Sequence, residues 1–479
     1  MAQSIDPSGI VVIGAGPAGL TAAYELSKHG LAGTIVEADD VVGGISRTVE
    51  RDGYRFDIGG HRFFTKAAEI EALWDEMLPE PMLVRPRLSR IFYANKFYDY
   101  PLKASNALRN MGILTAASCL ASYASARARP IPNPKSFEEW VINQFGRKLY
   151  AMFFKTYTEK VWGIPCSEIG ADWAAQRIKG LSLGEAVRNA LFGQRAGGVV
   201  KTLIDEFRYP RLGPGQLWEA CADSVVGSGW TLLKRTRVTG TTVENGRVVR
   251  LKLSGPDLAS SEIECSHVLS SMPLRNLVAA VDVCPEQVRQ SARGLAYRDF
   301  VTVALVVDAE SVFPDNWIYV HSPEVKLGRI QNFKNWSPHM VPNPAATCLG
   351  LEYFCNEGDD VWTMPDDQFV ELGYSEISTI GLARGKLLGG YVVRMPRAYP
   401  VYDTGYQERL NTVREWLRTV GGLQCIGRNG QHRYNNMDHS MMTALIAARN
   451  IARGLDLDPW AVNEDAEYHE TSRKDGARD

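Results

Sequence analysis

The sequence has no long apolar run. Its two most apolar stretches, residues 10–26 and 111–121, are interrupted by Gly, Ser, Thr or Glu, whereas a transmembrane helix needs roughly 20 consecutive apolar residues. The first residues contain no basic stretch followed by an apolar one, which is the pattern of a secretory signal. We therefore expect a cytoplasmic protein without a membrane partner.

Paired cysteines and an excess of either charge are also missing. The eight cysteines are scattered without a Cys-x-x-Cys pair, so neither a disulfide framework nor a zinc site is indicated, and we expect packed thiols and no metal. With 53 basic against 55 acidic residues the formal net charge is −2, which argues against nucleic acid as a partner. A few local arginines must then bind any anionic ligand. Nothing in the composition indicates the oligomeric state.

A glycine-rich turn near the N-terminus predicts a dinucleotide site. The apolar run 10–13 is followed by Gly14-Ala-Gly16-Pro-Ala-Gly19 and a predicted helix. Gly14 permits the tight turn, Gly16 lets the backbone approach a pyrophosphate, and Gly19 lets helix and strand pack closely. The phosphates would then face the helix N-terminus, where free N–H groups favour an anion. Glu37, which ends the next predicted strand, suits a ribose 2′-hydroxyl.

The segment that follows favours FAD over NAD. Gly43-Gly44 and Arg47 resemble the second motif of two-domain flavoproteins, which wraps the FAD pyrophosphate. Gly59-Gly60-His61 then predicts a loop that can approach a flavin ring closely and change conformation. We expect His61 to act through its place beside the flavin rather than as a general base.

From this loop onward the sequence resembles the UDP-galactopyranose mutases, especially their longer, eukaryotic-type members. The matching segments recur in order between residues 14 and 440: Phe137-Glu-Glu-Trp140, Lys160-Val-Trp162-Gly-Ile-Pro165, Trp173-Ala-Ala-Gln-Arg177, Gly213-Pro-Gly215, Trp317-Ile-Tyr319, Arg329-Ile-Gln-Asn-Phe-Lys-Asn335-Trp336, Tyr399-Pro400, Gly427-Arg428 and Asp438-His439-Ser440. Each match is weak alone, and their common order carries the resemblance.

The resemblance implies an isomerase that interconverts the pyranose and furanose forms of a nucleotide-diphosphate sugar, without net redox change. The N5 nitrogen of reduced flavin would attack the anomeric carbon and the nucleoside diphosphate would leave. The leaving diphosphate needs fixed cations, and the planar fork of arginine is the better choice. NADPH or NADH would be the reductant. With a single GxGxxG turn, either would bind without a Rossmann domain of its own.

The resemblance also assigns residues to roles. The catalytic candidates are His61, Arg177 and Arg329. The substrate-binding candidates are Tyr100, Lys103, Thr158, Trp162, Arg177, Trp317, Tyr319, Arg329, Asn335, Trp336, Tyr399, Tyr434 and Asn436. The cofactor-binding candidates are Gly14, Gly16, Ala18, Gly19, Glu37, Gly43, Gly44, Arg47, Gly59, Gly60, His61, Val238, Gly427, Arg428, Asn436, Met437, Asp438 and Ser440.

The expected fold is α/β: a Rossmann-like FAD-binding domain with an inserted helical domain and an antiparallel β-sheet substrate domain. The FAD-binding domain is discontinuous, because both halves of the chain carry its motifs. The expected ranges are 1–90, 206–285 and 405–462 for the FAD-binding domain, 91–205 for the mostly helical domain, 286–404 for the sheet domain and 463–479 for a flexible tail.

The nucleobase pocket departs from the family pattern. Tyr100-Pro-Leu-Lys103 stands where the family commonly has Tyr-Pro-x-Gln-Asn, Thr158 replaces an asparagine, and Trp336 stands where many members have tyrosine. Base recognition depends on such hydrogen-bond partners, so the choice between a UDP-sugar and a GDP-sugar stays open.

A flavin amine oxidase or a desaturase is the alternative enzyme, because it shares the FAD fold. Such enzymes need no paired arginines for a diphosphate, which favours the mutase. A silent flavin-binding protein is the third interpretation.

Overall fold

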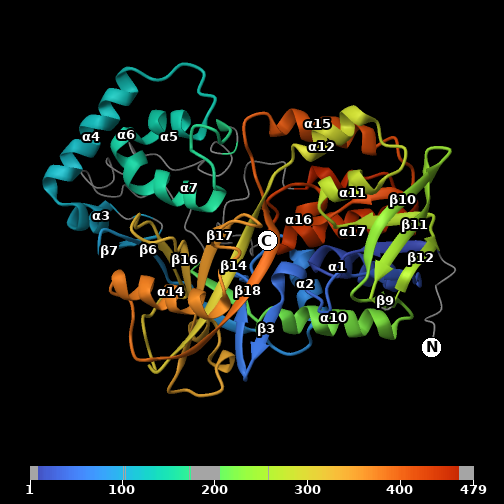
Figure 1. Cartoon of the computed structure of the whole chain (residues 1–479), viewed down its shortest axis with the longest axis horizontal. Helices are drawn as coiled ribbons and strands as arrows, with labels where there is room; N and C mark the ends of the chain where they lie inside the picture. Colours follow the sequence, from blue (N-terminus) through green and yellow to red (C-terminus); the bar gives the residue numbers. More distant parts are fainter. Residues whose placement is uncertain are drawn as a thin grey trace, which may run out of the picture.

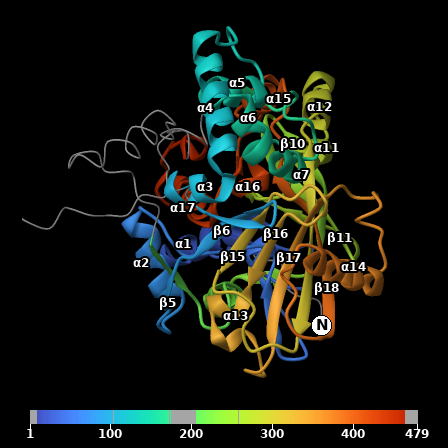
Figure 2. The same cartoon turned by 90° about the vertical axis from the view of Figure 1, so that its left-hand side faces the viewer.

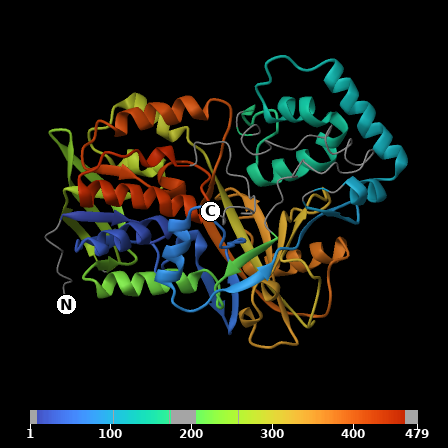
Figure 3. The ribbon, with the colours of Figure 1, turned by 180° about the vertical axis from the view of Figure 1, so that it is seen from behind.

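The computed structural model describes residues 9–100, 102, 104–171, 173, 205–256 and 258–462. Figures 1 and 3 show a layered α/β part at one end, a large sheet in the middle and a group of helices at the other end. The mixed α/β fold expected from the sequence is confirmed. Arg177 and Lys103 lie outside the described residues.

A five-stranded parallel sheet forms the centre of the layered part. Its strand order is β19-β13-β1-β2-β9. The strands are β1 (Ile10–Ile13), β2 (Thr34–Val36), β9 (Thr231–Leu233), β13 (His267–Ser270) and β19 (Leu423–Cys425). They come from three well-separated stretches of the chain, so this layered part is discontinuous in sequence.

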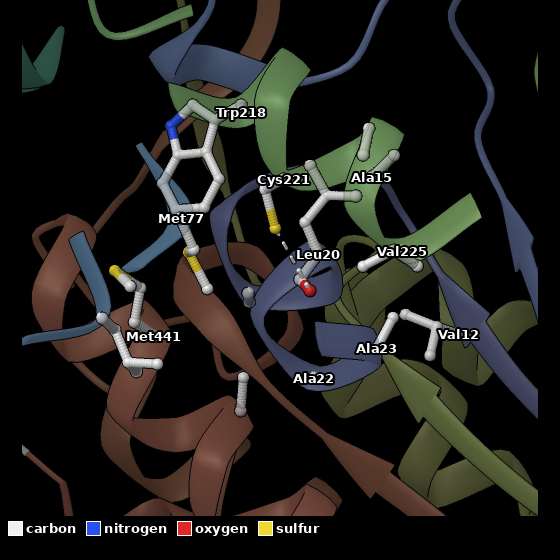
Figure 4. Close-up of a cluster of buried hydrophobic side chains, with 14 of the residues drawn as sticks. Val12, Ala15, Leu20, Ala22, Ala23, Met77, Trp218, Cys221, Val225 and Met441 are labelled. Carbon is white, nitrogen blue, oxygen red and sulfur yellow. Dashed lines mark hydrogen bonds between the residues drawn. The ribbon is translucent and has the colours of Figure 1, made fainter. Parts of the chain in front are cut away.

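Three helices pack beside this sheet: α1 (Pro17–Lys28), α10 (Gly215–Gly227) and α17 (Met437–Arg453). Pro17 at the first turn favours the start of α1, and the helix runs two residues past Leu26 before the positive-φ Gly30. The side chains that α1 turns toward its neighbours are small. Ala22 and Ala23 are fully buried, so α10 and α17 can approach α1 closely. Figure 4 shows Trp218 of α10 and Met441 of α17 around this face.

The remaining elements of this end cover the sheet and its edges. A second sheet consists of β10 (Arg237–Glu244), β11 (Arg247–Gly255) and β12 (Leu258–Glu264). The expected turn at Asn245-Gly246 is confirmed, since both residues have positive φ. The helices are α2 (Ala68–Met77), α11 (Leu274–Ala280), α12 (Glu286–Arg293), α15 (Tyr406–Leu417) and α16 (Gly427–Gly430).

A seven-stranded sheet lies in the middle of the molecule, in the order β18-β14-β17-β16-β15-β6-β7. Its strands are β6 (Ser89–Tyr93), β7 (Lys96–Asp99), β14 (Tyr297–Val307), β15 (Trp317–Val320), β16 (Arg329–Asn332), β17 (Thr347–Cys355) and β18 (Leu387–Pro400). All neighbours pair antiparallel except β15 and β6, which pair parallel.

This sheet is largely antiparallel, as expected, and β6 enters it beside β15 from an earlier part of the chain. Two of its strands come from residues 89–99. The six expected domain ranges stay a prediction. Helices α13 (Phe333–Trp336) and α14 (Asp366–Thr379) pack against this sheet.

The helical end carries one wall of the candidate site. It contains α3 (Ala104–Met111), α4 (Ile113–Ala128), α5 (Phe137–Phe145), α6 (Arg147–Leu149), the π-helical turn η2 (Tyr150–Lys155) and α7 (Thr156–Trp162). A capping box between Ser136 and Glu139 fixes the start of α5. Figure 2 shows these helices above the seven-stranded sheet.

All eight cysteines are buried and none is in a disulfide, which confirms the expectation of packed thiols. In the part of the chain that the structure describes, no helix is long and apolar enough to cross a membrane. The same residues contain no group of three or more His, Cys, Asp or Glu side chains that could hold a metal ion.

Candidate functional site

Three glycine segments converge at the N-terminus of α1. Gly14 has φ +98°, and a Cβ on Gly19 would lie 1.8 Å from the Gly14 carbonyl oxygen, so only glycine fits there. The backbones of Gly16 and Gly44 face each other, because a Cβ on Gly16 would lie 3.7 Å from the Gly44 Cα. A Cβ on Gly427 would lie 2.8 Å from the Ala18 Cβ. This bare-backbone cradle fits the pyrophosphate of a dinucleotide.

The acidic residue expected at the ribose lies at the edge of this cradle. Glu37 accepts hydrogen bonds from the Ala15 N–H at 2.6 Å and the Asp39 N–H at 2.8 Å. Burial raises the pKa of Glu37. Arg47 forms an ion pair with Asp39, so its guanidinium is held beside the second glycine turn. Val238 packs in the buried cluster that also contains Ile13 and Val36.

The N-terminus of α17 borders the same region. Asn436 is the N-cap, and its backbone N–H donates to His439 Nδ1 at 3.1 Å in a capping box. Asp438, a cofactor-binding candidate, is the second residue of the helix and is buried. Thr443 Oγ1 accepts a hydrogen bond from the Gly427 N–H at 2.8 Å. The expected cofactor segments 427–428 and 436–440 are therefore held together by α17.

The Gly59-Gly60-His61 loop follows β4 (Tyr54–Asp57), which pairs with β3 (Thr48–Arg51). The His61 Nε2 lies 3.0 Å from the Ile58 carbonyl oxygen. A carbonyl oxygen only accepts, so the tautomer that fits carries its proton on Nε2. Burial, with smaller contributions from nearby arginines, lowers the pKa of His61 to about 4. The imidazole is thus neutral at pH 7.

A buried ion pair forms the floor of the candidate substrate site. Arg329 on β16 and Glu352 on β17 are register partners and their side chains form an ion pair. Glu352 is fully buried and accepts a hydrogen bond from Gln331 Nε2 at 2.7 Å. Although burial acts in the opposite direction, Glu352 and the surrounding tyrosines raise the pKa of Arg329 well above its usual value. Arg329 is therefore a fixed cation. Its Nη2 also donates to the Tyr399 hydroxyl at 2.9 Å.

Aromatic side chains surround this cation. Tyr399 and Tyr434 stack with ring centroids 5.7 Å apart and an interplanar angle of 14°. The Arg428 guanidinium lies over the Tyr434 ring at 4.8 Å and donates to the Asn435 carbonyl. Trp162, at the end of α7, meets the edges of both tyrosines at 6.5 and 6.4 Å. The helical end thereby supplies one wall of the site.

A second aromatic group extends the site away from Tyr399. Tyr319 contacts Tyr100 at 5.0 Å and Tyr157 at 5.6 Å between ring centroids. Trp317 lies 6.3 Å from Tyr319. Thr158 is buried on α7, one turn before Trp162. The structure thus brings together candidates from the helices, the sheet and the segment 427–440.

Two candidates are not brought into this site. Trp336 is 1% exposed and its indole N–H donates to the Asn316 carbonyl at 3.0 Å. It lies beneath the flavin loop, since a Cβ on Gly60 would lie 3.2 Å from its ring. The Asn335 amide donates to the Phe313 and Asp315 carbonyls. Both side chains support the loop and sheet, because the short helix α13 turns them inward.

Three residues of the site were missed by sequence reasoning. Glu352 was detectable as the one acidic residue in the apolar run Thr347–Cys355. Gln331 alternates with Arg329 along β16 and so shares its face. Tyr157 stacks on His321 at 4.7 Å, and burial raises its pKa well above the usual value. Nothing local distinguishes Tyr157 from other tyrosines, because its neighbours come from a distant strand.

Comparison with known proteins places the chain among flavin enzymes. The chain is 27% identical over 434 residues to a probable UDP-galactopyranose mutase of Klebsiella pneumoniae, covering 87% of this chain and 96% of that protein. It is 23% identical over 459 residues to the coproporphyrinogen III oxidase of Mycobacterium bovis, covering 89% and 96%. The crystal structure of a reduced UDP-galactopyranose mutase superposes with a TM-score of 0.82 at 22% identity, covering 95% of this chain and 97% of that one. Residues 17–452 match the flavin-containing amine oxidoreductases, and the chain belongs to this family of FAD enzymes.

Proposed function

We propose that this protein is a flavin-dependent mutase that interconverts the pyranose and furanose forms of a nucleotide-diphosphate sugar. The observation that carries the proposal is Arg329, a half-buried cation held by Glu352 that donates to the Tyr399 hydroxyl among aromatic side chains. A diphosphate leaving group needs such a fixed cation with hydroxyl donors around it. An oxidase that acts on an uncharged amine or alkene has no use for it.

Each wall of the site has a part in this reaction. Arg329 and Tyr399 bind the diphosphate and stabilise the charge that develops when its bond to the sugar breaks. The stacked Tyr399 and Tyr434 exclude water on one side, and Trp162 closes the helical side. Arg177, outside the described residues, is proposed as the second diphosphate arginine. Reduced FAD, when bound, supplies the nucleophile for the anomeric carbon.

Neutral His61 is proposed to orient the loop beside the flavin. Its Nε2–H donates to the Ile58 carbonyl, and burial holds its pKa at about 4, so it is a poor general base. The positively charged N-terminal end of α17 and the Arg428 guanidinium would stabilise negative charge on reduced flavin.

The nucleotide is proposed to be UDP or GDP, as in an eukaryotic-type mutase or a GDP-sugar variant of it. The test uses purified protein reduced chemically without oxygen and given UDP-galactose or GDP-galactose. Chromatography looks for the furanose product. We expect product from one nucleotide only, none from oxidised protein, and at least a hundred-fold less from Arg329→Met. An enzyme that is instead reduced by an amine or a porphyrinogen and reoxidised by oxygen would refute the mutase.

The reductant is proposed to be NADPH or NADH. Either nicotinamide should bleach the flavin absorbance near 450 nm when mixed without oxygen, on the order of seconds to minutes at room temperature. The natural control is the protein with dithionite, which reports full bleaching. If dithionite bleaches the flavin and neither nicotinamide does, a separate reductase is required.

A further inference from the structure

Two arginine side chains outside the diphosphate site share one tryptophan. Arg62 immediately follows His61, and its guanidinium carbon lies 5.6 Å from the Trp317 ring centroid. Arg87 follows β5 (Leu83–Pro86), and its guanidinium carbon lies 5.4 Å from the same centroid and 5.6 Å from the Tyr100 ring. Two chain segments 25 residues apart thus place like charges at one aromatic side chain.

The Arg87 guanidinium is not satisfied by the protein. Its Nε and Nη2 are buried and have no hydrogen-bond partner among the described residues. The two neighbouring arginines are different. Arg85 donates twice to the Asn335 carbonyl, and Arg90 binds Asp315 through two hydrogen bonds. Buried guanidinium N–H groups almost always have a hydrogen-bond acceptor. The unpartnered Nε and Nη2 of Arg87 therefore indicate that a ligand supplies the acceptor.

Charge repulsion points to the same conclusion. Burial, and after it the charge of Arg87, lowers the pKa of Arg62 to about 10, against the opposing effect of Tyr319, Tyr100 and Tyr434. Two cations held close together in a half-buried setting repel each other, and a bound anion between them would remove that repulsion. Both guanidinium groups also lie within cation–π distance of Trp317, which holds the pair near one ring.

We propose that Arg62 and Arg87 bind a carboxylate carried by the sugar of the substrate, which would then be a nucleotide-linked uronic acid. This inference rests on the proposed function. Arg329 already serves the diphosphate, so a second cationic site calls for a second anionic group. Arg62 is adjacent to His61, on the loop beside the flavin where the sugar must lie. A planar carboxylate matches the arginine fork.

The test is binding of matched ligand pairs to the FAD-loaded protein, measured by calorimetry: UDP-galacturonate against UDP-galactose, and GDP-mannuronate against GDP-mannose. We expect the uronate of one pair to bind about ten- to a hundred-fold more tightly. In Arg87→Gln the ratio of the two affinities should fall to about one. Arg87→Lys, which keeps the charge but loses the fork, should retain part of the preference.

The control variant is Arg147→Gln, because the Arg147 side chain is 73% exposed on the helical end. It removes the same charge and should leave the ratio unchanged. Equal affinity of wild-type protein for uronate and neutral sugar overturns the inference while leaving the mutase intact. A preference that survives in Arg87→Gln also overturns it. Failure to bind either UDP or GDP, with bound FAD intact, overturns both the inference and the proposed function.

Discussion

Arg329 and Glu352 stand directly opposite each other on β16 and β17, and their ion pair lies inside the seven-stranded sheet. The pair gives the site a cation that cannot lose its proton, and it leaves the outer part of the guanidinium free to face Tyr399. Because Glu352 is fully buried, neither partner can be removed without leaving a charge in the sheet.

The first prediction follows from this pair. Glu352→Gln and Arg329→Met should each lower the free energy of unfolding by about 3–5 kcal/mol, because each leaves one charge uncompensated. The double variant Arg329→Met/Glu352→Gln should be more stable than the sum of the two single effects indicates. Urea unfolding of all four proteins measures the coupling. Additivity within about 0.5 kcal/mol would mean that the two side chains do not interact.

Flavin retention should depend on the close approach at Gly19. In Gly19→Ala the added methyl group would overlap the Gly14 carbonyl oxygen at 1.8 Å, so the cradle must open. We expect purified Gly19→Ala to contain at least ten-fold less FAD per chain, measured by absorbance near 450 nm. The matched control is Gly227→Ala in α10, where a Cβ would meet nothing within 4 Å. That variant should keep its full FAD content; equal FAD in the two variants would contradict the prediction.

Lys160 is predicted to position the strands that carry Tyr319 and Arg329. Its ammonium group donates to the Ser322 carbonyl at 2.6 Å and the Leu327 carbonyl at 3.0 Å, between β15 and β16. Lys160→Met should lower stability by about 1–3 kcal/mol, since it leaves buried carbonyls unsatisfied, and should lower kcat as Arg329 shifts. Thermal unfolding and steady-state kinetics report both effects.

The control for Lys160 is Lys155→Met, an exposed lysine just before the same helix. It should change neither stability nor kcat. If Lys160→Met loses stability but keeps kcat, Lys160 supports the fold without positioning the site.

Stability should fall in mild acid because buried histidines, above all His321 and His432, must take up protons on unfolding. Burial lowers the pKa of both His321 and His432 to about 3, from about 6.5 in an unfolded chain. A group with a depressed pKa contributes stability that is present above pH 6.5 and is lost as the pH falls through the folded pKa, at roughly 1.4 kcal/mol per histidine and pH unit. The dependence applies between pH 6.5 and about 3.

The measurement for this prediction is urea unfolding at pH 7 and pH 5. His432→Gln should lose less stability than the wild type over this interval. Buried Asp57, whose pKa burial raises to about 7, acts in the opposite direction, since its contribution is present at low pH and is lost as the pH rises. The difference between wild type and His432→Gln isolates the histidine. An unchanged difference at the two pH values would contradict the prediction.

Much of the fold could be predicted because local signals agreed with it. Three segments are defined by their apolar pattern or by turn and capping residues, and so require no distant partner: residues 10–13, the turn at Asn245-Gly246 and the helix that ends at Gly454. The parallel pairing of β6 with β15 could not be predicted, because it depends on which edge of a sheet an early segment reaches. The inward rotation of Trp336 depends on the short helix α13, which has no distinct sequence pattern.

The residues of the candidate site likewise fall into those that the sequence predicts and those that only the fold identifies. Arg329, Tyr399 and Tyr434 lie in motifs whose spacing is visible in the sequence, and the structure places them together. Glu352 and Arg87 act through partners that lie far away in the chain, so only the folded arrangement identifies their surroundings. Sequence patterns indicate residue types, whereas the neighbours that set charge and burial come from the topology.

The assembly of the parallel sheet from three separated stretches has a consequence for biosynthesis. Strand β19 is the edge beside β13, and the ribosome reaches it only at residue 423. The glycine cradle also needs Gly427 and the start of α17. The nascent chain therefore completes the helical end and the large sheet, whose last strand ends at Pro400, before its flavin cradle can close. Such long-range contacts make folding slow, and we expect a chain cut before residue 423 to collect no flavin.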